Sequence, residues 1–280
     1  MTTPLTLGYS PCPNDTYIFY GLTHGKLALP GIELAPPLLE DVETLNSWAI
    51  QKKLDITKLS FHALGHVMDE YCVLSAGSAL GRGCGPLLVA RPGFDAAALG
   101  DAKIAIPGRL TTANLLFRMY SPESHDLLEL RFDEIMSAVK NGEVDAGVII
   151  HESRFTYAAQ GLACLQDLGQ WWEESTSHPI PLGCIAARRS LGRERIEQID
   201  KAIHDSIVWA DEHPGDCLPY IRQYAQEMDE RVMQNHINLY VNDYSRALGT
   251  DGKAAIETFL RLGREAGILP IHSKEITLQI

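Results

Sequence analysis

The chain has 280 residues, of which 45% are hydrophobic and 21% are charged, and its formal net charge at pH 7 is −12. This composition is typical of a globular protein with a sizeable core, and the length suits one large domain or two moderate ones. The acidic balance, which no Lys/Arg-rich block interrupts, argues against a nucleic acid or an anionic membrane surface as the main partner. A small anionic substrate is compatible with this charge, because a local site can be positive on an acidic protein.

The sequence predicts a cytoplasmic protein. Residues 1–7 contain neither a basic stretch nor a long apolar run, so we expect no secretory signal. No stretch approaches the run of about 18 apolar residues that marks a membrane-spanning helix. The six cysteines form no C-x-x-C pair, which argues against a zinc ribbon or a thioredoxin-type centre and suits buried thiols in a reducing compartment.

Residues 1–90 alternate short apolar runs with helical patterns, which favours a parallel or mixed sheet with helices on both faces. Asn14 or Asp15 is placed to cap the first helix, and Gly25 is placed to end it. The pattern predicts strands over 5–9, 31–39, 55–60 and 72–76, and helices over 14–25 and 41–53.

A second series of strands and helices follows a break at 91–93. The glycine cluster over 77–85 precedes a strand and not a helix, so it predicts a hinge or tight loop and not a phosphate-binding motif. The apolar run 146–150 is typical of a strand that is buried on both faces. We predict strands over 86–90, 103–106, 127–132 and 146–150, and helices over 111–120 and, capped by Asp133, 133–142.

The last third of the chain is predicted to be helical. Isoleucines recur at three- and four-residue spacing from Ile196 to Ile207, which indicates an amphipathic helix that stops near Pro214. The whole pattern predicts two α/β lobes with a helical C-terminal return, and a cleft between lobes is a common site for a small ligand. Further helices are predicted over 217–228, 231–240 and 252–267; the larger lobe comprises 1–90 and 184–280, and the smaller one 91–183.

His151 directly follows the buried strand, at the end where open α/β sheets place their ligands. A neutral imidazole titrates near physiological pH and suits proton transfer. His151 is therefore a candidate general base or ligand contact. The alternative is a structural histidine whose ring nitrogen ties down a loop.

Thr111 and Thr112 open a predicted helix, where free backbone N–H groups can hold an anion such as a substrate carboxylate. The alternative for Thr111 is a plain helix cap. Arg109 either adds positive charge to this site or is simply solvated.

Lys58 and Ser60 lie two residues apart on a predicted strand, so their side chains share one face. A lysine on a face that is closed to solvent needs a partner anion. The alternative is an edge position from which Lys58 reaches water.

Other patterns indicate packing more than chemistry. Cys12 has no histidine nearby in sequence to activate it as a nucleophile. His62 and His66 can share a helix face, but no third ligand follows at a defined spacing, so we predict no metal. Trp171 and Trp172 suit packing, and no G-x-S-x-G elbow is present.

Segments along the first two thirds of the chain form an ordered set of motifs. They are 10–16, 39–46, 57–60, 81–83 with 85–87, 107–109 with 111–112, 149–157, and 181–183 with 187–189, followed by a weaker match at 240–242. Each motif alone is modest, whereas the ordered set is specific. The set resembles the 1,4-dihydroxy-6-naphthoate synthase family of the futalosine route to menaquinone.

The resemblance implies a fold like that of the type II periplasmic binding proteins, with a small anionic aromatic substrate in the cleft between the lobes. It also implies a carbon–carbon lyase that converts cyclic dehypoxanthinylfutalosine to 1,4-dihydroxy-6-naphthoate. Aromatisation drives such a reaction, so no cofactor and no metal are expected. By the same resemblance, His151 is the proton acceptor, and the substrate contacts are Lys58, Leu59, Ser60, Thr111 and Thr112.

Other functions fit the same architecture, because fold alone does not separate catalysis from binding. One is the sister enzyme of the pathway, a chorismate dehydratase, against which the segments 10–16 and 149–157 favour the synthase. Another is a non-catalytic solute-binding protein of a transporter, against which the expected lack of a secretory signal argues. A regulator's effector lobe is disfavoured, since we find no N-terminal DNA-binding module or basic patch.

Overall fold

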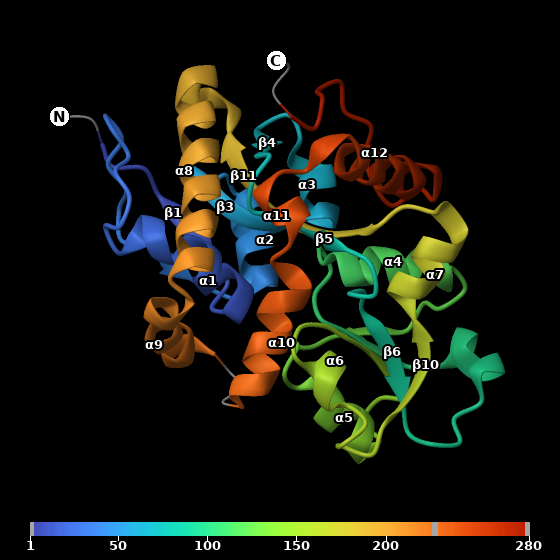
Figure 1. The fold of residues 1–280 in the computed structure, drawn as a ribbon. Helices are drawn as coiled ribbons and strands as arrows, with labels where there is room; N and C mark the ends of the chain where they lie inside the picture. The colour runs from blue at the N-terminus through green and yellow to red at the C-terminus, as the bar shows by residue number, and fades with distance from the viewer. Residues whose placement is uncertain (1–2, 226–228, 278–280) are drawn as a thin grey trace. The chain divides into compact units, whose positions relative to one another are not determined.

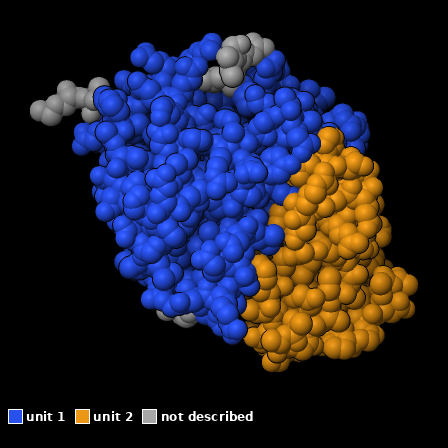
Figure 2. Space-filling model, in the orientation of Figure 1, with its two compact units in different colours: residues 1–81, 181–280 blue, residues 82–180 orange. Residues whose placement is uncertain are grey.

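The computed structural model describes residues 3–225 and 229–277. The chain divides into two compact units, which Figure 2 shows in blue and orange. Unit 1 comprises the residues up to 81 and from 181 onward, and unit 2 comprises residues 82–180. Within the described residues, no helix is long and apolar enough to cross a bilayer.

Unit 1 is built on a mixed sheet. The strand order is β2-β1-β3-β11-β4, with β5 paired to β11. Strand β1 runs parallel to β2 and β3, whereas β11 runs antiparallel to β3 and β4. Its strands are β1 (Leu7–Tyr9), β2 (Leu38–Leu39), β3 (Ile56–Ser60), β4 (Tyr71–Val73), β5 (Ala79–Gly81) and β11 (Ile180–Arg188).

The helices of unit 1 come from both ends of the chain. Helix α1 packs against α8, α9 and α10, so the N-terminal segment and the C-terminal helices share one core (Figure 1). Isoleucines of α8 from Ile196 to Ile207 face that core, as their spacing predicts. The helices are α1 (Pro13–Thr23), α2 (Val42–Ile50), α3 (Phe61–Val67), α8 (Arg193–Glu212), α9 (Pro214–Tyr224), α10 (Glu230–Tyr240), α11 (Asp243–Arg246) and α12 (Gly249–Glu265).

Unit 2 contains a second mixed sheet, of order β10-β6-β9-β7-β8. Strand β9 lies in the middle and all four of its residues are buried, which confirms the strand predicted from the apolar run. The strands are β6 (Leu87–Ala90), β7 (Ile104–Ile106), β8 (Leu127–Glu129), β9 (Ala146–Ile149) and β10 (Ala163–Asp167), and the helices are α4 (Thr112–Tyr120), α5 (Ile135–Asn141), α6 (Ser153–Thr156) and α7 (Leu168–Thr176).

The borders of the units differ by nine and by three residues from those of the predicted lobes. Residues 82–90 lie in unit 2, because β6 pairs with β9 and β10. Residues 181–183 lie in unit 1, because β11 pairs with β3. Neither pairing leaves a local sequence signal, since the partners are far apart in the chain.

Several elements differ from the sequence prediction. The strand predicted over 31–39 shrinks to β2 plus one bridge between Leu5 and Leu34, because Pro36 and Pro37 have no N–H to donate to a ladder. Helix α5 begins two residues after Asp133, which pairs with Arg131 and is not the cap.

Two other predicted elements have different ends in the structure. The strand predicted over 127–132 ends at residue 129 in β8, and the last predicted helix begins at residue 249 in α12. The helix predicted over 217–228 corresponds to α9, and its residues 226–228 lie outside the described part of the chain. Strands β5, β10 and β11 and helices α6, α7 and α11 were not predicted, and α3 was indicated only by the helical spacing of His62 and His66.

Candidate active site

Strand β3 carries the candidate residues of unit 1, and all five of its residues are buried. Lys58 and Ser60 share one face of the strand, and the side chain of Leu59 lies on the other. The ammonium Nζ of Lys58 lies 2.6 Å from Oδ1 of Asp15, and the two side chains are only 7% and 1% exposed. A buried ammonium requires such a counter-charge. The structure thus confirms the buried lysine with a partner anion and excludes the solvated edge position.

Two residues of β11 lie beside Lys58 and shape its surroundings. Gly183 pairs with Ser60 in the ladder, and a Cβ added there would lie 3.2 Å from Cε of Lys58 and 2.8 Å from the carbonyl oxygen of Leu59. Glycine therefore makes room for the lysine stem. Burial raises the pKa of the adjacent Cys184 thiol to about 12, so this cysteine stays neutral and Asp15 supplies the negative charge.

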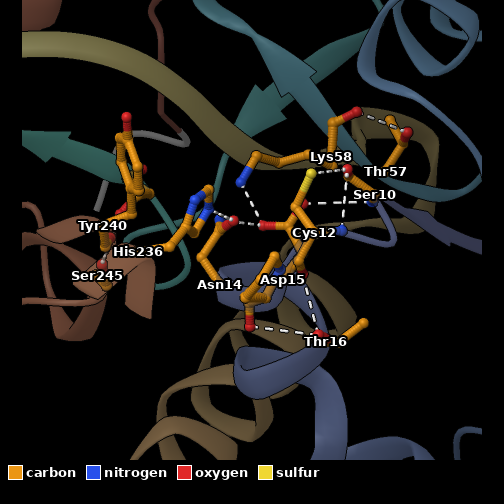
Figure 3. Close-up of polar contacts among 12 residues, drawn as sticks. Ser10, Cys12, Asn14, Asp15, Thr16, Thr57, Lys58, His236, Tyr240 and Ser245 are labelled. Carbon is orange, nitrogen blue, oxygen red and sulfur yellow. Dashed lines mark hydrogen bonds and ion pairs between the residues drawn. The ribbon is translucent and has the colours of Figure 1, made fainter. Parts of the chain in front are cut away.

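Asp15 lies in the first turn of α1, after the loop that leaves β1. Its carboxylate accepts hydrogen bonds from three donors: Lys58 at 2.6 Å, the Asn14 side-chain amide at 2.8 Å and the Ser10 backbone N–H at 3.3 Å (Figure 3). The hydroxyl of Ser10 donates to the sulfur of Cys12 at 2.9 Å. The segment 10–16 is thus folded around a buried carboxylate.

Ser60 is held by a reciprocal pair of hydrogen bonds with Asn46 on α2. The Ser60 backbone N–H donates to Oδ1 of Asn46 at 2.9 Å, and Nδ2 of Asn46 donates to Oγ of Ser60 at 3.1 Å. Because Oγ of Ser60 accepts from Asn46, its own O–H can donate to a ligand. Asn46 was not predicted as a site residue, although it ends the motif 39–46.

Thr111 is the N-cap of α4. Its hydroxyl accepts from the backbone N–H of Asn114 at 3.2 Å and donates to the carbonyl of Gly108 at 2.8 Å, so the predicted cap is confirmed. Thr111 and Thr112 are both buried, and α4 is nine residues long. What this helix start can offer a ligand is its backbone N–H groups and the positive end of its dipole.

Arg109 is solvated, which is the second of the two alternatives considered for it. Its side chain is 80% exposed and forms an ion pair with Glu129 at 3.1 Å. A pair that is this exposed contributes little to stability. The arginine therefore adds no buried charge to the start of α4.

His151 lies in the turn after β9 and is half-buried. Its backbone φ is +57°, in the left-handed region that few non-glycine residues adopt and that costs about 1–3 kcal/mol. The ring makes an edge contact with Phe132, with centroids 4.9 Å apart. Strain of this kind clusters at functional sites.

The loop after His151 is fixed by Arg154. This guanidinium bonds the carboxylate of Asp167 and the carbonyl of Gly85, both at 2.6 Å. Asp167 in turn caps α7, and a Cβ on Gly85 would lie 2.3 Å from Cα of Gly169. The motifs 85–87 and 149–157 are therefore tied together by structural contacts inside unit 2.

The remaining candidates have packing roles or no defined ligand set. His62 and His66 lie on α3 with ring centroids 5.3 Å apart, and burial, followed by the charge of His272, lowers the pKa of His66. Across residues 3–225 and 229–277, no group of three His, Cys, Asp or Glu side chains is arranged to hold a metal. Trp172 is buried and donates to the carbonyl of Pro179 at 3.1 Å.

The predicted site residues thus form two groups. Lys58, Leu59 and Ser60 belong to unit 1, whereas Thr111, Thr112 and His151 belong to unit 2. The additional polar residues of unit 1, which the sequence analysis did not assign to the site, are Asn14, Asp15, Asn46 and His236.

Comparison with known proteins identifies relatives over nearly the whole chain. A family model described as menaquinone biosynthesis matches residues 5–265. A 1,4-dihydroxy-6-naphthoate synthase of Thermus thermophilus is 49% identical over 252 residues, which is 90% of this chain and 91% of that protein. A protein of the same name from Streptomyces coelicolor is 42% identical over 271 residues and 95% of each chain.

Solved structures agree with this relation. An Archaeoglobus fulgidus protein that is 36% identical aligns with a TM-score of 0.89 over 95% of this chain and 98% of its own. A Candida albicans protein described as having the generic periplasmic binding protein fold aligns at 0.70 with 15% identity, over 100% of this chain and 98% of its own. The chain therefore has a periplasmic-binding-protein-like α/β fold and belongs to the menaquinone biosynthesis family, as an enzyme whose curated relatives are named 1,4-dihydroxy-6-naphthoate synthase.

Proposed function

We propose that this enzyme is a carbon–carbon lyase that converts cyclic dehypoxanthinylfutalosine to 1,4-dihydroxy-6-naphthoate, with His151 as the proton acceptor. The observation that carries the proposal is the strained, half-buried position of His151 at the end of a buried strand. The 49% identity to a relative that is named for this product supports the choice of reaction.

The chemistry suits the available groups. Breaking a carbon–carbon bond with aromatisation requires a base to remove a proton and donors to stabilise developing negative charge on oxygen. His151 takes the proton, and the hydroxyl of Ser60 donates to a substrate oxygen. The start of α4 at Thr111 and Thr112 holds the substrate carboxylate through the positive end of the helix dipole. The new aromatic ring supplies the driving force, so this step needs no redox partner.

Lys58 and Leu59 complete the proposed contacts. Lys58 offers its ammonium to a substrate oxygen. Leu59 contributes through its main chain, because its side chain lies on the opposite face of β3 from Lys58 and is fully buried. We propose that the substrate is a small anionic aromatic molecule, and that the reaction takes place in the cytoplasm.

The direct test is product formation by the purified protein. We expect incubation with cyclic dehypoxanthinylfutalosine to yield 1,4-dihydroxy-6-naphthoate, identified by absorbance and mass, and a parallel incubation with chorismate to leave chorismate unchanged. Dehydration of chorismate would indicate the sister enzyme. Tight binding of either compound without turnover would indicate a binding protein, and both results would overturn the proposal.

A further inference from the structure

A chain of buried polar side chains leads from Lys58 to a helix far along the sequence. Lys58 bonds Asp15, Nδ2 of Asn14 donates to Oδ1 of Asp15 at 2.8 Å, and Oδ1 of Asn14 lies 2.9 Å from Nε2 of His236 on α10 (Figure 3). Asn14, Asp15 and His236 are all buried. These hydrogen-bonded side chains therefore link β3, α1 and α10 within unit 1.

The direction of every bond in this chain is fixed by chemistry. The carboxylate of Asp15 can only accept, so the amide of Asn14 must present its NH₂ group to Asp15 and its carbonyl oxygen to His236. That oxygen also only accepts, so Nε2 of His236 must carry a hydrogen. His236 thereby fixes the orientation of Asn14, Asn14 fixes the carboxylate, and the carboxylate fixes the ammonium.

Stability alone is a weak reason for such a chain. Burying charged and polar groups costs desolvation free energy. A protein with well-packed apolar side chains of similar volume in their place is often equally stable or more stable. Around His236, α10 buries apolar side chains such as Met233 and Ile237, which would suit an apolar residue at position 236 as well.

In this series of side chains, Lys58 is the residue that can donate further hydrogen bonds to a substrate. An ammonium has three N–H bonds, and among the described residues Asp15 is the acceptor that Nζ of Lys58 reaches. The ammonium is a point charge on a lysine stem with several rotatable bonds, so on its own it has no fixed direction. A carboxylate that is itself held in place confines the ammonium to one direction.

We propose that Asp15, Asn14 and His236 form a positioning relay that aims the ammonium of Lys58 at an oxygen of the substrate. This inference rests on the proposed function, which makes Lys58 a substrate contact. None of the three relay residues touches the substrate; each acts through the next one, and His236 acts from the distant C-terminal part of unit 1.

The test is a double-mutant cycle on kcat/KM for cyclic dehypoxanthinylfutalosine. His236→Leu removes the donor, and we expect kcat/KM to fall about tenfold, mainly through a higher KM. His236→Gln keeps an amide N–H near the position of Nε2 and is expected to restore kcat/KM to within about threefold of the wild-type value. In the Lys58→Met background, His236→Leu is expected to cause no further loss.

Each outcome separates the relay from other roles. If the losses from His236→Leu and Lys58→Met multiply, His236 does not act through Lys58 and the relay is wrong. If only Lys58→Met is impaired, the relay is wrong and Lys58 remains a substrate contact. If Lys58→Met retains normal kcat/KM, both the relay and the proposed contact of Lys58 are wrong. Ile237→Val is the matched control, because it trims the same buried helix face without touching the polar chain, and it should leave kcat/KM unchanged.

A second measurement requires no substrate. Nitrogen NMR of the ¹⁵N-histidine-labelled wild-type protein reports which ring nitrogen of His236 carries hydrogen. The relay requires a protonated Nε2, and an Nε2 without hydrogen would overturn it whatever the kinetic results. This readout tests the relay even if the proposed substrate proves wrong.

Discussion

The two groups of candidate site residues are built in different ways. In unit 1, side chains from distant parts of the sequence hold one another, as in the bonds of Asp15 to Lys58 and of Asn46 to Ser60. In unit 2, short-range backbone geometry sets the positions of the candidate residues, through the helix cap at Thr111 and the left-handed turn at His151. A change in unit 1 should therefore spread through a buried network, whereas a change in unit 2 should act locally.

The largest expected effect on stability comes from the buried ion pair of unit 1. Asp15→Asn leaves the ammonium of Lys58 buried without a counter-charge, and we expect the free energy of unfolding to fall by about 3–5 kcal/mol. Urea denaturation measures it. The exposed pair of Lys201 and Asp205 provides the control, since Asp205→Asn should cost less than about 1 kcal/mol. Equal losses at the two sites would mean that the buried pair carries no special weight.

A smaller effect is expected at the glycine beside the lysine stem. Gly183→Ala places a methyl group against the main chain of Leu59 and Cε of Lys58, and such overpacking costs about 1–3 kcal/mol. Gly215→Ala in α9 is the matched control, because a Cβ there meets nothing within 4 Å and alanine favours a helix. Thermal unfolding should separate the two variants, and a destabilised Gly215→Ala with an unchanged Gly183→Ala would refute the explanation.

The smallest of these effects is expected in unit 2, where the change is local. Thr111→Ala removes the helix cap of α4 and should cost about 1 kcal/mol, whereas Thr111→Ser keeps the hydroxyl and should cost less. Denaturation midpoints of the two variants measure the difference. A loss from Thr111→Ala as large as that from Asp15→Asn would contradict the contrast between a networked and a local construction.

This contrast also explains what the sequence can predict. Thr111 and His151 stand out because their surroundings are local: a helix start after a Pro-Gly turn, and the end of an apolar run. The alternation along β3 indicates that Lys58 needs an anion if buried, but not which one, because Asp15 lies 43 residues away. His236 leaves no local signal, since its partner Asn14 is separated from it by 222 residues.

The same reasoning holds for the fold. Apolar runs and helical spacing correctly indicate β9, α4 and the long helix α8. Strand β11 was missed, although it lies between β3 and β4 in the sheet of unit 1 and its buried residues form an apolar run. Such a run does not reveal which distant strands it pairs with. Proline removes donors from the segment predicted as a strand over 31–39, which local hydrophobicity does not reveal.

The most direct test of the account is the single-turnover rate of His151→Asn. Asparagine tolerates the left-handed backbone of this turn but cannot act as the base, so the change removes the chemistry without adding strain. We expect the fold and substrate binding to persist while the rate of 1,4-dihydroxy-6-naphthoate formation falls about 100- to 10,000-fold, and the exposed His125→Asn of the same unit to behave as wild type. A His151→Asn protein that turns over at nearly the wild-type rate would contradict the assignment of His151 as the proton acceptor.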